Sequence, residues 1–381
     1  MPDIPLNLVS AAAQREELHV RLRASAEARL SAIGASRPER AQRTYAQDRE
    51  LKAWTVDIFR LYSRGLINVW VPLAMVAFIA CTWTPIVIYY LDPLVVETNL
   101  TTVSGDVCVV LSNAESAFRL ILTAISFMLV FRLNRSATRS YEARQLCGSI
   151  MIHCRDLAMT SIATRAGATG ELSAETRDQL CEVAVAFPVA FMVHVWGEPT
   201  TRADTFDTMC QQIFDSPTSA MLRAASHRPL ALIEHAQAIL AAQFLDNGER
   251  DSPARATLYQ AMLQSVRGLG APLGGCERIQ GTPLPYAYVV HLRSFLLIVV
   301  CGIPVVYACD WRWATIPLSL LVAFGLLGIE AASFECEKPF SPTPNKNNHD
   351  VEKFCAILSR DVTEMLERAA AREKVTRDGR V

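Results

Sequence analysis

The sequence predicts an all-α integral membrane protein with four transmembrane helices and a large helical region outside the bilayer. Hydrophobic residues make up 51% of the 381 residues and are gathered into long runs. The run over residues 66–91 holds 26 residues without a charge, which is long enough to cross a bilayer. The more polar stretches between the runs have helical periodicity, and none shows the alternating pattern of a strand. Together these observations define the fold class.

The bulk composition narrows the class of function. The net charge is −1, so the bulk charge gives no indication of nucleic-acid binding, and no nucleic-acid partner is expected. Eleven cysteines are scattered without a C-x-x-C pair. That usage predicts free thiols in a reducing compartment, with neither a disulfide framework nor a zinc site. The first residues lack the apolar core of a signal peptide.

The first part of the chain is expected to lead into a membrane span. Residues 1–65 are expected to form cytosolic helices, because residues 6–32 are rich in Ala, Leu, Arg and Glu and a basic segment follows them. Residues 66–91 form the first predicted span. Trp70 and Tyr90 near its ends suit the bilayer interfaces. Pro85 inside it is tolerated in a membrane bundle, where neighbours satisfy the freed backbone groups.

Residues 117–148 are expected to form one helix that passes from hydrocarbon into water. Phe118 to Val130 carries a single charge, Arg119, and four arginines follow within thirteen residues. Neither Gly nor Pro interrupts this stretch before Gly148. Before it we expect a loop over residues 92–115, which hold four acidic residues and no basic one.

Residues 149–281 have the character of a soluble helical domain on the cytosolic side. Ser173 can cap a helix that runs to Pro188 or beyond. Arg228-Pro229 opens a second helix, which ends near Gly248, and Ser252-Pro253 opens a third, which ends near Gly268. We expect residues 274–285, rich in Gly and Pro, to form a break.

A second pair of spans is predicted over residues 292–334. Its apolar runs, 295–309 and 313–334, are separated only by Asp310, Trp311 and Arg312. Residues 335–381 are expected to form a polar loop followed by an amphipathic helix over residues 350–374.

The orientation follows from the positions of basic residues. The short loops between spans hold one basic residue, Arg312, whereas the flanks before Leu66 and after Phe131 are rich in arginine. By the positive-inside rule both termini and the helical domain share the cytoplasmic or stromal side. The plasma membrane and the plastid thylakoid cannot be distinguished on this basis.

Several motifs resemble those of one known family. Phe131-Arg132-x-Asn134, followed by Arg139-x-x-Glu142-x-Arg144, resembles the end of the second transmembrane helix of bestrophins, particularly the bacterial and plastid branch. Thr282-Pro-Leu-Pro-Tyr286 resembles the entry to the third span of that family. Glu335-x-Glu-Lys-Pro-Phe340 resembles the segment that leaves its fourth span.

The resemblance implies a homopentameric channel with a narrow neck on the second transmembrane helix. In that family three residues at four-residue spacing form the neck, and Thr123, Phe127 and Phe131 match these positions, although the family usually begins the neck with an aliphatic residue. Arg119 and Arg135 extend the same face by one step at either end. A hydrophobic constriction between basic vestibules suits an anion pore, since arginines attract anions and repel cations.

The residues of this face also have simpler interpretations. Apolar residues at helical spacing are usually packing residues. Arg119 can instead reach the lipid headgroups or pair with Glu115, four residues earlier. Arg132 and Arg139 are interpreted as ordinary positive-inside anchors.

Two further groups of charged residues are expected to be structural. Glu142 and Arg144 are interpreted as salt-bridge partners. Glu330, inside the last apolar run, needs a partner within the protein, and both Arg132 and Arg293 are candidates.

These features predict passive conduction of chloride, with bicarbonate or nitrate as further candidate anions. No calcium clasp is expected, since Lys338 and Lys346 and two prolines stand where animal bestrophins have an acidic run. The seven histidines are dispersed, so we expect no catalytic residues, no metal site, no cofactor and no enzymatic activity. The alternative is a non-conducting membrane scaffold or sensor that acts through its cytosolic helices.

Overall fold

The computed structural model describes residues 69–91, 101–164, 172–197, 203–246, 253–340 and 349–378, together with residue 20. Within these ranges the secondary structure is helical throughout, with no strand. The chain divides into two compact units. The membrane unit comprises Thr44–Tyr141 and Thr282–Asn348, and the helical unit comprises Met1–Arg43, Glu142–Gly281 and His349–Val381. The expected helix at residues 6–32 and the basic segment after it lie outside the described residues.

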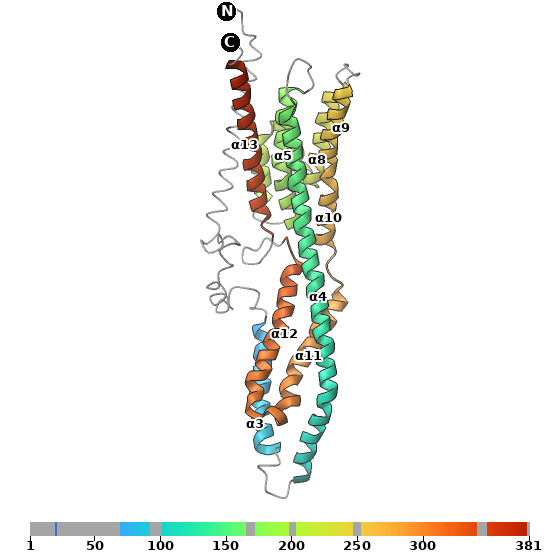
Figure 1. The fold of residues 1–381 in the computed structure, drawn as a ribbon, viewed down its shortest axis with the longest axis vertical. Helices are drawn as coiled ribbons and strands as arrows, with labels where there is room; N and C mark the ends of the chain where they lie inside the picture. The colour runs from blue at the N-terminus through green and yellow to red at the C-terminus, as the bar shows by residue number, and fades with distance from the viewer. Residues whose placement is uncertain are drawn as a thin grey trace, which may run out of the picture. The chain divides into compact units, whose positions relative to one another are not determined.

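The membrane unit is built from α3 (Trp70–Ile86), α11 (Tyr286–Trp311), α12 (Thr315–Glu337) and the first part of α4 (Thr101–Ala163), as Figure 1 shows. The π-helix η4 (Val87–Leu91) follows α3 directly, and the 3₁₀ turn η6 (Arg312–Ala314) joins α11 to α12. Arg312 takes a positive φ of 49° at the end of α11. The two helices are therefore joined as tightly as the sequence predicts.

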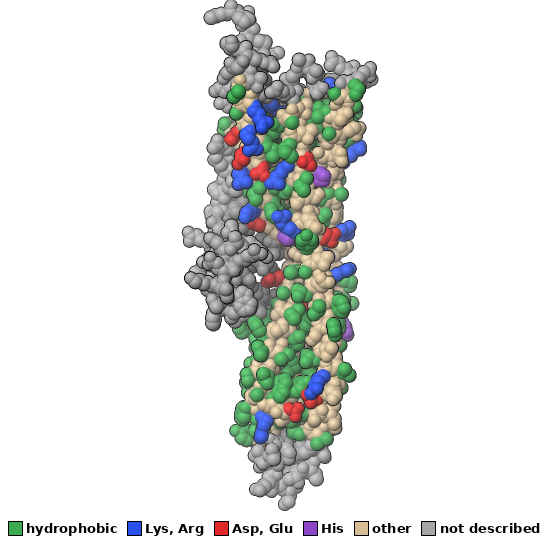
Figure 2. Space-filling view, viewed as in Figure 1, with side chains coloured by type: hydrophobic (Ala, Val, Ile, Leu, Met, Phe, Trp, Pro, Cys, Tyr) green, Lys and Arg blue, Asp and Glu red, His purple; other side chains and the backbone are tan. Residues whose placement is uncertain are grey.

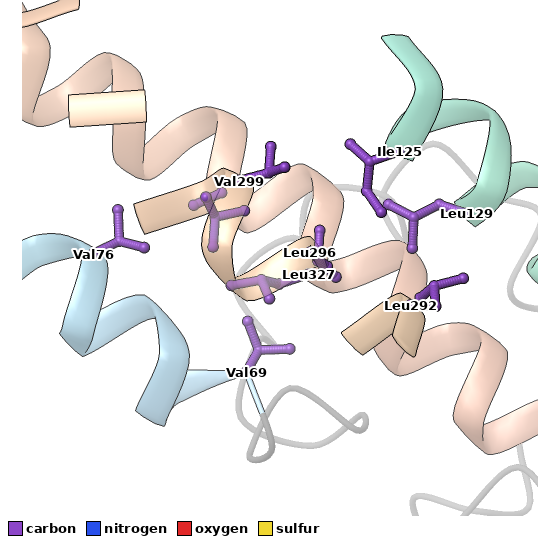
Figure 3. Packing of buried hydrophobic residues seen from close by; sticks show 10 residues of the cluster. Val69, Val76, Ile125, Leu129, Leu292, Leu296, Val299 and Leu327 are labelled. Carbon is purple, nitrogen blue, oxygen red and sulfur yellow. The ribbon is translucent and has the colours of Figure 1, made fainter. Parts of the chain in front are cut away.

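One apolar cluster joins all four helices of the membrane unit. In Figure 3, Leu327 of α12 lies beside Leu296 of α11, Val76 approaches them from α3, and Ile125 and Leu129 approach α11 from α4. Ile125 and Leu129 are fully buried. In hydrocarbon such helices associate through close packing rather than through the hydrophobic effect. The indole N–H of Trp83 also donates a hydrogen bond to the carbonyl of Val305, at 3.3 Å.

Among the residues that the structure describes, four helical stretches are long and apolar enough to cross a membrane. Three of these stretches correspond to the four predicted spans. Trp70–Tyr90 and Cys108–Ala163 hold one span each, and Tyr286–Glu337 holds two, in α11 and α12. Their most apolar windows are only 17–33% buried within the chain. The visible face of the membrane unit is mostly hydrophobic, as Figure 2 shows. Such a surface suits contact with lipid or with further subunits.

The fourth stretch, α5 (Ala174–Trp196), is 78% buried inside the protein. It packs against α8 (Arg228–Ala241), α6 (Ala203–Ile213), α10 (Gly270–Gly281) and α13 (Val351–Asp378). Because protein covers it on nearly all sides, its apolar sequence is that of a core helix. The remaining helices of this unit are α7 (Ser216–Ala224), α9 (Pro253–Gly268) and the π-helix η5 (Ala242–Asp246).

Most of the helix starts predicted for this unit are confirmed. The Ser173 side chain accepts a hydrogen bond from the Thr176 N–H, at 3.0 Å, and α5 follows it. Helices α8 and α9 begin at Arg228 and Pro253, and α13 begins at Val351. In each case a capping residue or an early proline marks the start.

Two predicted breaks are wrong. The loop expected over residues 92–115 is already helix from Thr101 onward, because residues 101–115 contain no proline and the single glycine, Gly105, costs only about 1 kcal/mol. The break expected over residues 274–285 is helix α10 as far as Gly281. A Cβ atom on Gly275 would lie 2.8 Å from Leu146 Cδ1, so glycine here permits close packing of α10 on α4.

The expectation of free thiols is wrong at two positions. A disulfide joins Cys108 of α4 to Cys309 of α11, with their Cα atoms 6.0 Å apart. The two cysteines are 201 residues apart, so their spacing carried no signal. The other nine cysteines form no disulfide.

Gly302 of α11 lies at a close contact with α4. A Cβ atom at this position would lie 2.9 Å from Cε2 of Phe118. We therefore expect Gly302→Ala to lower the free energy of unfolding by about 1–3 kcal/mol through overpacking. The measurement is denaturant unfolding in mixed detergent micelles. The control is Gly325→Ala on α12, where a Cβ atom meets nothing within 4 Å and the change is expected to be neutral or mildly stabilising. Equal effects of the two substitutions would contradict the assigned contact.

Candidate functional site

Helix α4 has two faces of opposite character within the membrane unit. One face is completely buried: Ile125, Leu129, Arg132 and Ser136 each have 0% exposure. The other face carries the residues that the sequence analysis selects, and all of them are exposed: Arg119, Thr123, Phe127, Phe131 and Arg135. The two faces follow from the helical period, since Ile125 and Leu129 are offset by two residues from Thr123 and Phe127.

Phe127 and Phe131 stand out on the exposed face. Their exposed fractions are 62% and 69%, so these aromatic rings do not serve packing within the chain. The Thr123 hydroxyl donates to the carbonyl of Arg119, at 2.8 Å, which leaves its methyl group and oxygen lone pairs on the surface. A helix that buries a charged residue on one side while exposing two phenylalanines on the other needs an explanation for the exposed side.

The buried side is fixed by a carboxylate held between two arginines. Glu330 Oε2 lies 2.7 Å from Nε of Arg132, and Glu330 Oε1 lies 2.7 Å from Nε of Arg293. Both candidate partners of Glu330 are therefore used, one from α4 and one from α11. The Arg132 side chain is 0% exposed and that of Glu330 is 11% exposed.

Arg132 and Arg139, interpreted from the sequence as ordinary positive-inside anchors, also make specific contacts within the protein. Besides Glu330, Arg132 has Glu337 nearby, with Nη2 3.5 Å from Oε2. Arg139 donates to two backbone carbonyls, those of Glu337 at 3.2 Å and Thr282 at 2.8 Å. These carbonyls lie at the end of α12 and just before α11, so the two arginines connect α4 to both helices.

Arg119 forms the pair that the sequence left open. Its Nε lies 3.2 Å from Glu115 Oε1, one turn earlier on α4. Its side chain stays 69% exposed, so the pair does not withdraw the guanidinium from the surface. Exposed pairs of this kind contribute little to stability. Arg135 is also exposed, and it stands at the opposite end of the aromatic stripe.

In the helical unit Glu142 is a salt-bridge partner, as predicted, whereas the contact of Arg144 is with an aromatic ring and not with the predicted carboxylate. Glu142 forms an ion pair with Arg278 of α10, at 2.7 Å. The Arg144 guanidinium lies over the ring of Phe354, 4.3 Å from its centroid. A cation over an aromatic face is attracted by the ring quadrupole, so both contacts hold α4 to neighbouring helices of the unit.

The structure also brings together three residues that the sequence analysis did not single out. His194, His227 and Glu277 come from α5, from the residue that caps α8, and from α10. Their separations of 33 and 50 positions form no recognisable ligand spacing, so only the packing of the helices reveals the cluster.

The fold and the charged residues buried within it define a multi-pass α-helical membrane protein. The family model described as bacterial/fungal bestrophin protein matches residues 45–364. The chain therefore belongs to the bestrophin family.

Named relatives agree with this assignment. A voltage-dependent anion channel-forming protein of Nostoc sp. is 27% identical over 241 residues, which cover 63% of this chain and 74% of the relative. The chloroplastic voltage-dependent chloride channel 2 of Arabidopsis thaliana is 27% identical over 258 residues, and the match spans 58% of that relative.

Solved structures show the same fold. The crystal structure of a bacterial bestrophin homologue from Klebsiella pneumoniae, carrying a point mutation, superposes with a TM-score of 0.62 and 20% sequence identity. The superposition covers 79% of this chain and 99% of that one.

The ion pairs of Glu330 give a direct test of how α4 is held. Glu330→Ala leaves the fully buried Arg132 without its nearest carboxylate, and breaking a buried pair in this way costs about 3–5 kcal/mol. We expect that loss in the free energy of unfolding, measured in mixed micelles. Glu335→Ala, on the same helix and without an ion pair among the described residues, serves as the control and is expected to change stability by less than about 0.5 kcal/mol. A similar loss in both variants would rule out a special role for Glu330.

Proposed function

We propose that the chain forms a pentameric, passive anion channel, in which the exposed face of α4 lines the pore. One observation carries this proposal: Phe127 and Phe131 are exposed on a helix whose opposite face is anchored by the buried Arg132. One helix cannot enclose a pore, so the face must meet its copies around an axis. The number five rests on resemblance to the family. The names of the relatives support anions as the permeant class.

In this proposal Phe127 and Phe131 form a hydrophobic neck. A narrow apolar constriction resists wetting, so ions cross it only when it widens or when the ring edges, which are weakly positive, stabilise a desolvated anion. Thr123 gives the outer end of the neck a hydroxyl-bearing, narrower side chain. Arg119 and Arg135 raise the local concentration of anions at the two ends.

Chloride is the proposed main ion, with bicarbonate or nitrate as further substrates. The proposed gating does not use a calcium clasp. Much of the segment on which that expectation rests, residues 341–348, lies outside the described residues. Because the proposed gating uses no calcium clasp, the anion flux is expected to be the same with and without calcium.

The direct test is halide efflux from liposomes that contain the purified protein, with potassium efflux measured in parallel. We expect halide efflux to exceed potassium efflux, with or without calcium. An intact oligomer that releases neither ion would instead favour a scaffold or sensor that acts through the helical unit.

The neck is tested by the double variant Phe127→Ala, Phe131→Ala. Removing both rings widens the apolar constriction and lowers its barrier to wetting, so we expect a several-fold increase in halide efflux from an oligomer of unchanged size. Phe78→Ala, which removes a ring that is 71% exposed on α3, is the matched control and is expected to leave the flux unchanged. Parent-like flux in the double variant would remove the neck from the account.

Selectivity is tested by Arg119→Glu. The exchange places a carboxylate where a guanidinium attracted anions, and we expect the chloride-to-potassium permeability ratio to fall several-fold. The ratio is obtained from reversal potentials in planar bilayers. Arg312→Glu reverses a charge at the junction of α11 and α12 and is expected to have a much smaller effect. An unchanged ratio in the Arg119 variant would make that arginine a headgroup anchor.

A further inference from the structure

Three side chains of the helical unit converge on one point from three helices. Nε2 of His194 lies 2.9 Å from Glu277 Oε1, and Nε2 of His227 lies 2.7 Å from the same oxygen. The two imidazole rings are 4.3 Å apart between centroids, tilted by 38°. One ligand atom from each residue therefore lies within 4.8 Å of the other two.

The chemistry of the cluster is that of a zinc site with an open position. Two imidazole nitrogens and one carboxylate oxygen are a known ligand set for Zn²⁺, with water as the fourth ligand. Ligand atoms about 2.0–2.2 Å from the ion in tetrahedral geometry are roughly 3.3 Å apart from one another. The observed distances to Glu277 must open by only a few tenths of an ångström to reach that value.

The cluster is accessible and is supported from behind. The side chains of His194, His227 and Glu277 are 29%, 34% and 36% exposed, so an ion can enter and a water molecule can complete its shell. The next residue, Arg278, pairs with Glu142 of α4 at 2.7 Å, and this contact helps to hold the helix α10 that carries Glu277. The three ligands come from α5, from the N-cap of α8 and from α10, elements that pack together within the helical unit, so they are brought together before an ion binds.

A bound ion would replace hydrogen bonds that the His227 ring now makes. Nδ1 of His227 accepts the Leu230 N–H at 3.2 Å, so the proton of the neutral ring lies on Nε2 and points at Glu277. Binding through Nε2 moves that proton to Nδ1 and gives up this long capping bond. The exchange replaces two N–H to carboxylate hydrogen bonds with three bonds to a divalent ion.

We propose that His194, His227 and Glu277 bind one Zn²⁺ ion per chain, with water in the fourth position. The ion ties α5, α8 and α10 together at one point and so stabilises the helical unit. The proposal does not depend on conduction, because all three ligands belong to this unit and binding can be measured directly.

The first experiment is a calorimetric titration of zinc chloride into the full-length protein in detergent after removal of metal with a chelator. We expect one saturable zinc ion per chain. His194→Gln and Glu277→Gln should each weaken binding by about 100-fold or more, since even outer-shell changes cost 10–100-fold. His235→Gln removes another histidine of α8, one that lies edge-on to Phe214, and should bind zinc as the parent does.

The visible absorption spectrum of bound Co²⁺ distinguishes a specific tetrahedral site from adventitious metal binding. Co²⁺ in a tetrahedral site of the parent protein absorbs strongly in the visible range, and zinc should abolish that absorption by displacement. Because this spectrum is recorded on the unsubstituted protein, it tests the proposed site even if a ligand variant fails to fold. The absence of saturable zinc binding, or a weak octahedral cobalt spectrum, would overturn the proposal and leave a hydrogen-bonded cluster only.

Discussion

Glu330 is the residue on which the arrangement of the membrane unit depends. A lone carboxylate in the last apolar run is costly, and the structure meets that cost with Arg132 from α4 and Arg293 from α11, each at 2.7 Å. The same arginine of α4 has Glu337 within 3.5 Å, and Arg139 holds the backbone at Glu337 and Thr282. Directional contacts of this kind fix the rotation of α4 about its own axis, which apolar packing alone specifies only loosely.

The rotation of α4 decides what its other face can do. With Arg132 turned inward, Phe127 and Phe131 lie on the other side of the helix and are exposed, and Arg119 and Arg135 at the two ends of the stripe are exposed as well. The exposed stripe is thus a consequence of the buried ion pairs. In an oligomer with this face on its axis, the phenylalanines would form a hydrophobic constriction with arginines at both ends, and the chain would not need to change its conformation. In the helical unit, α10 likewise makes different contacts through neighbouring residues: Arg278 pairs with Glu142 of α4, and Glu277 contacts two histidines.

The sequence was informative where local chemistry decides the outcome. Ser173, Pro229 and Pro253 mark helix starts because capping and the fixed φ of proline act within one turn. The stripe of α4 could be found because the helical period relates Thr123 to Phe127 and Phe131. The extent of α10 was missed because its glycines favour a break locally, whereas packing of Gly275 on Leu146 favours a helix. The Cys108–Cys309 disulfide and the histidine cluster depend on contacts between residues far apart in the chain. The sequence indicated two candidate ion-pair partners for Glu330, Arg132 and Arg293, and only the fold shows that Glu330 contacts both.

The central claim is that the exposed face of α4 surrounds the axis of an oligomer. An experimental structure of the assembled protein in a lipid nanodisc tests this most directly, because it places the Phe127 and Phe131 rings relative to the symmetry axis and to the lipid. The account predicts that both rings point at the axis and form its narrowest part, with Glu330 still between Arg132 and Arg293. Rings of Phe127 and Phe131 that face acyl chains, with another helix on the axis, would contradict it.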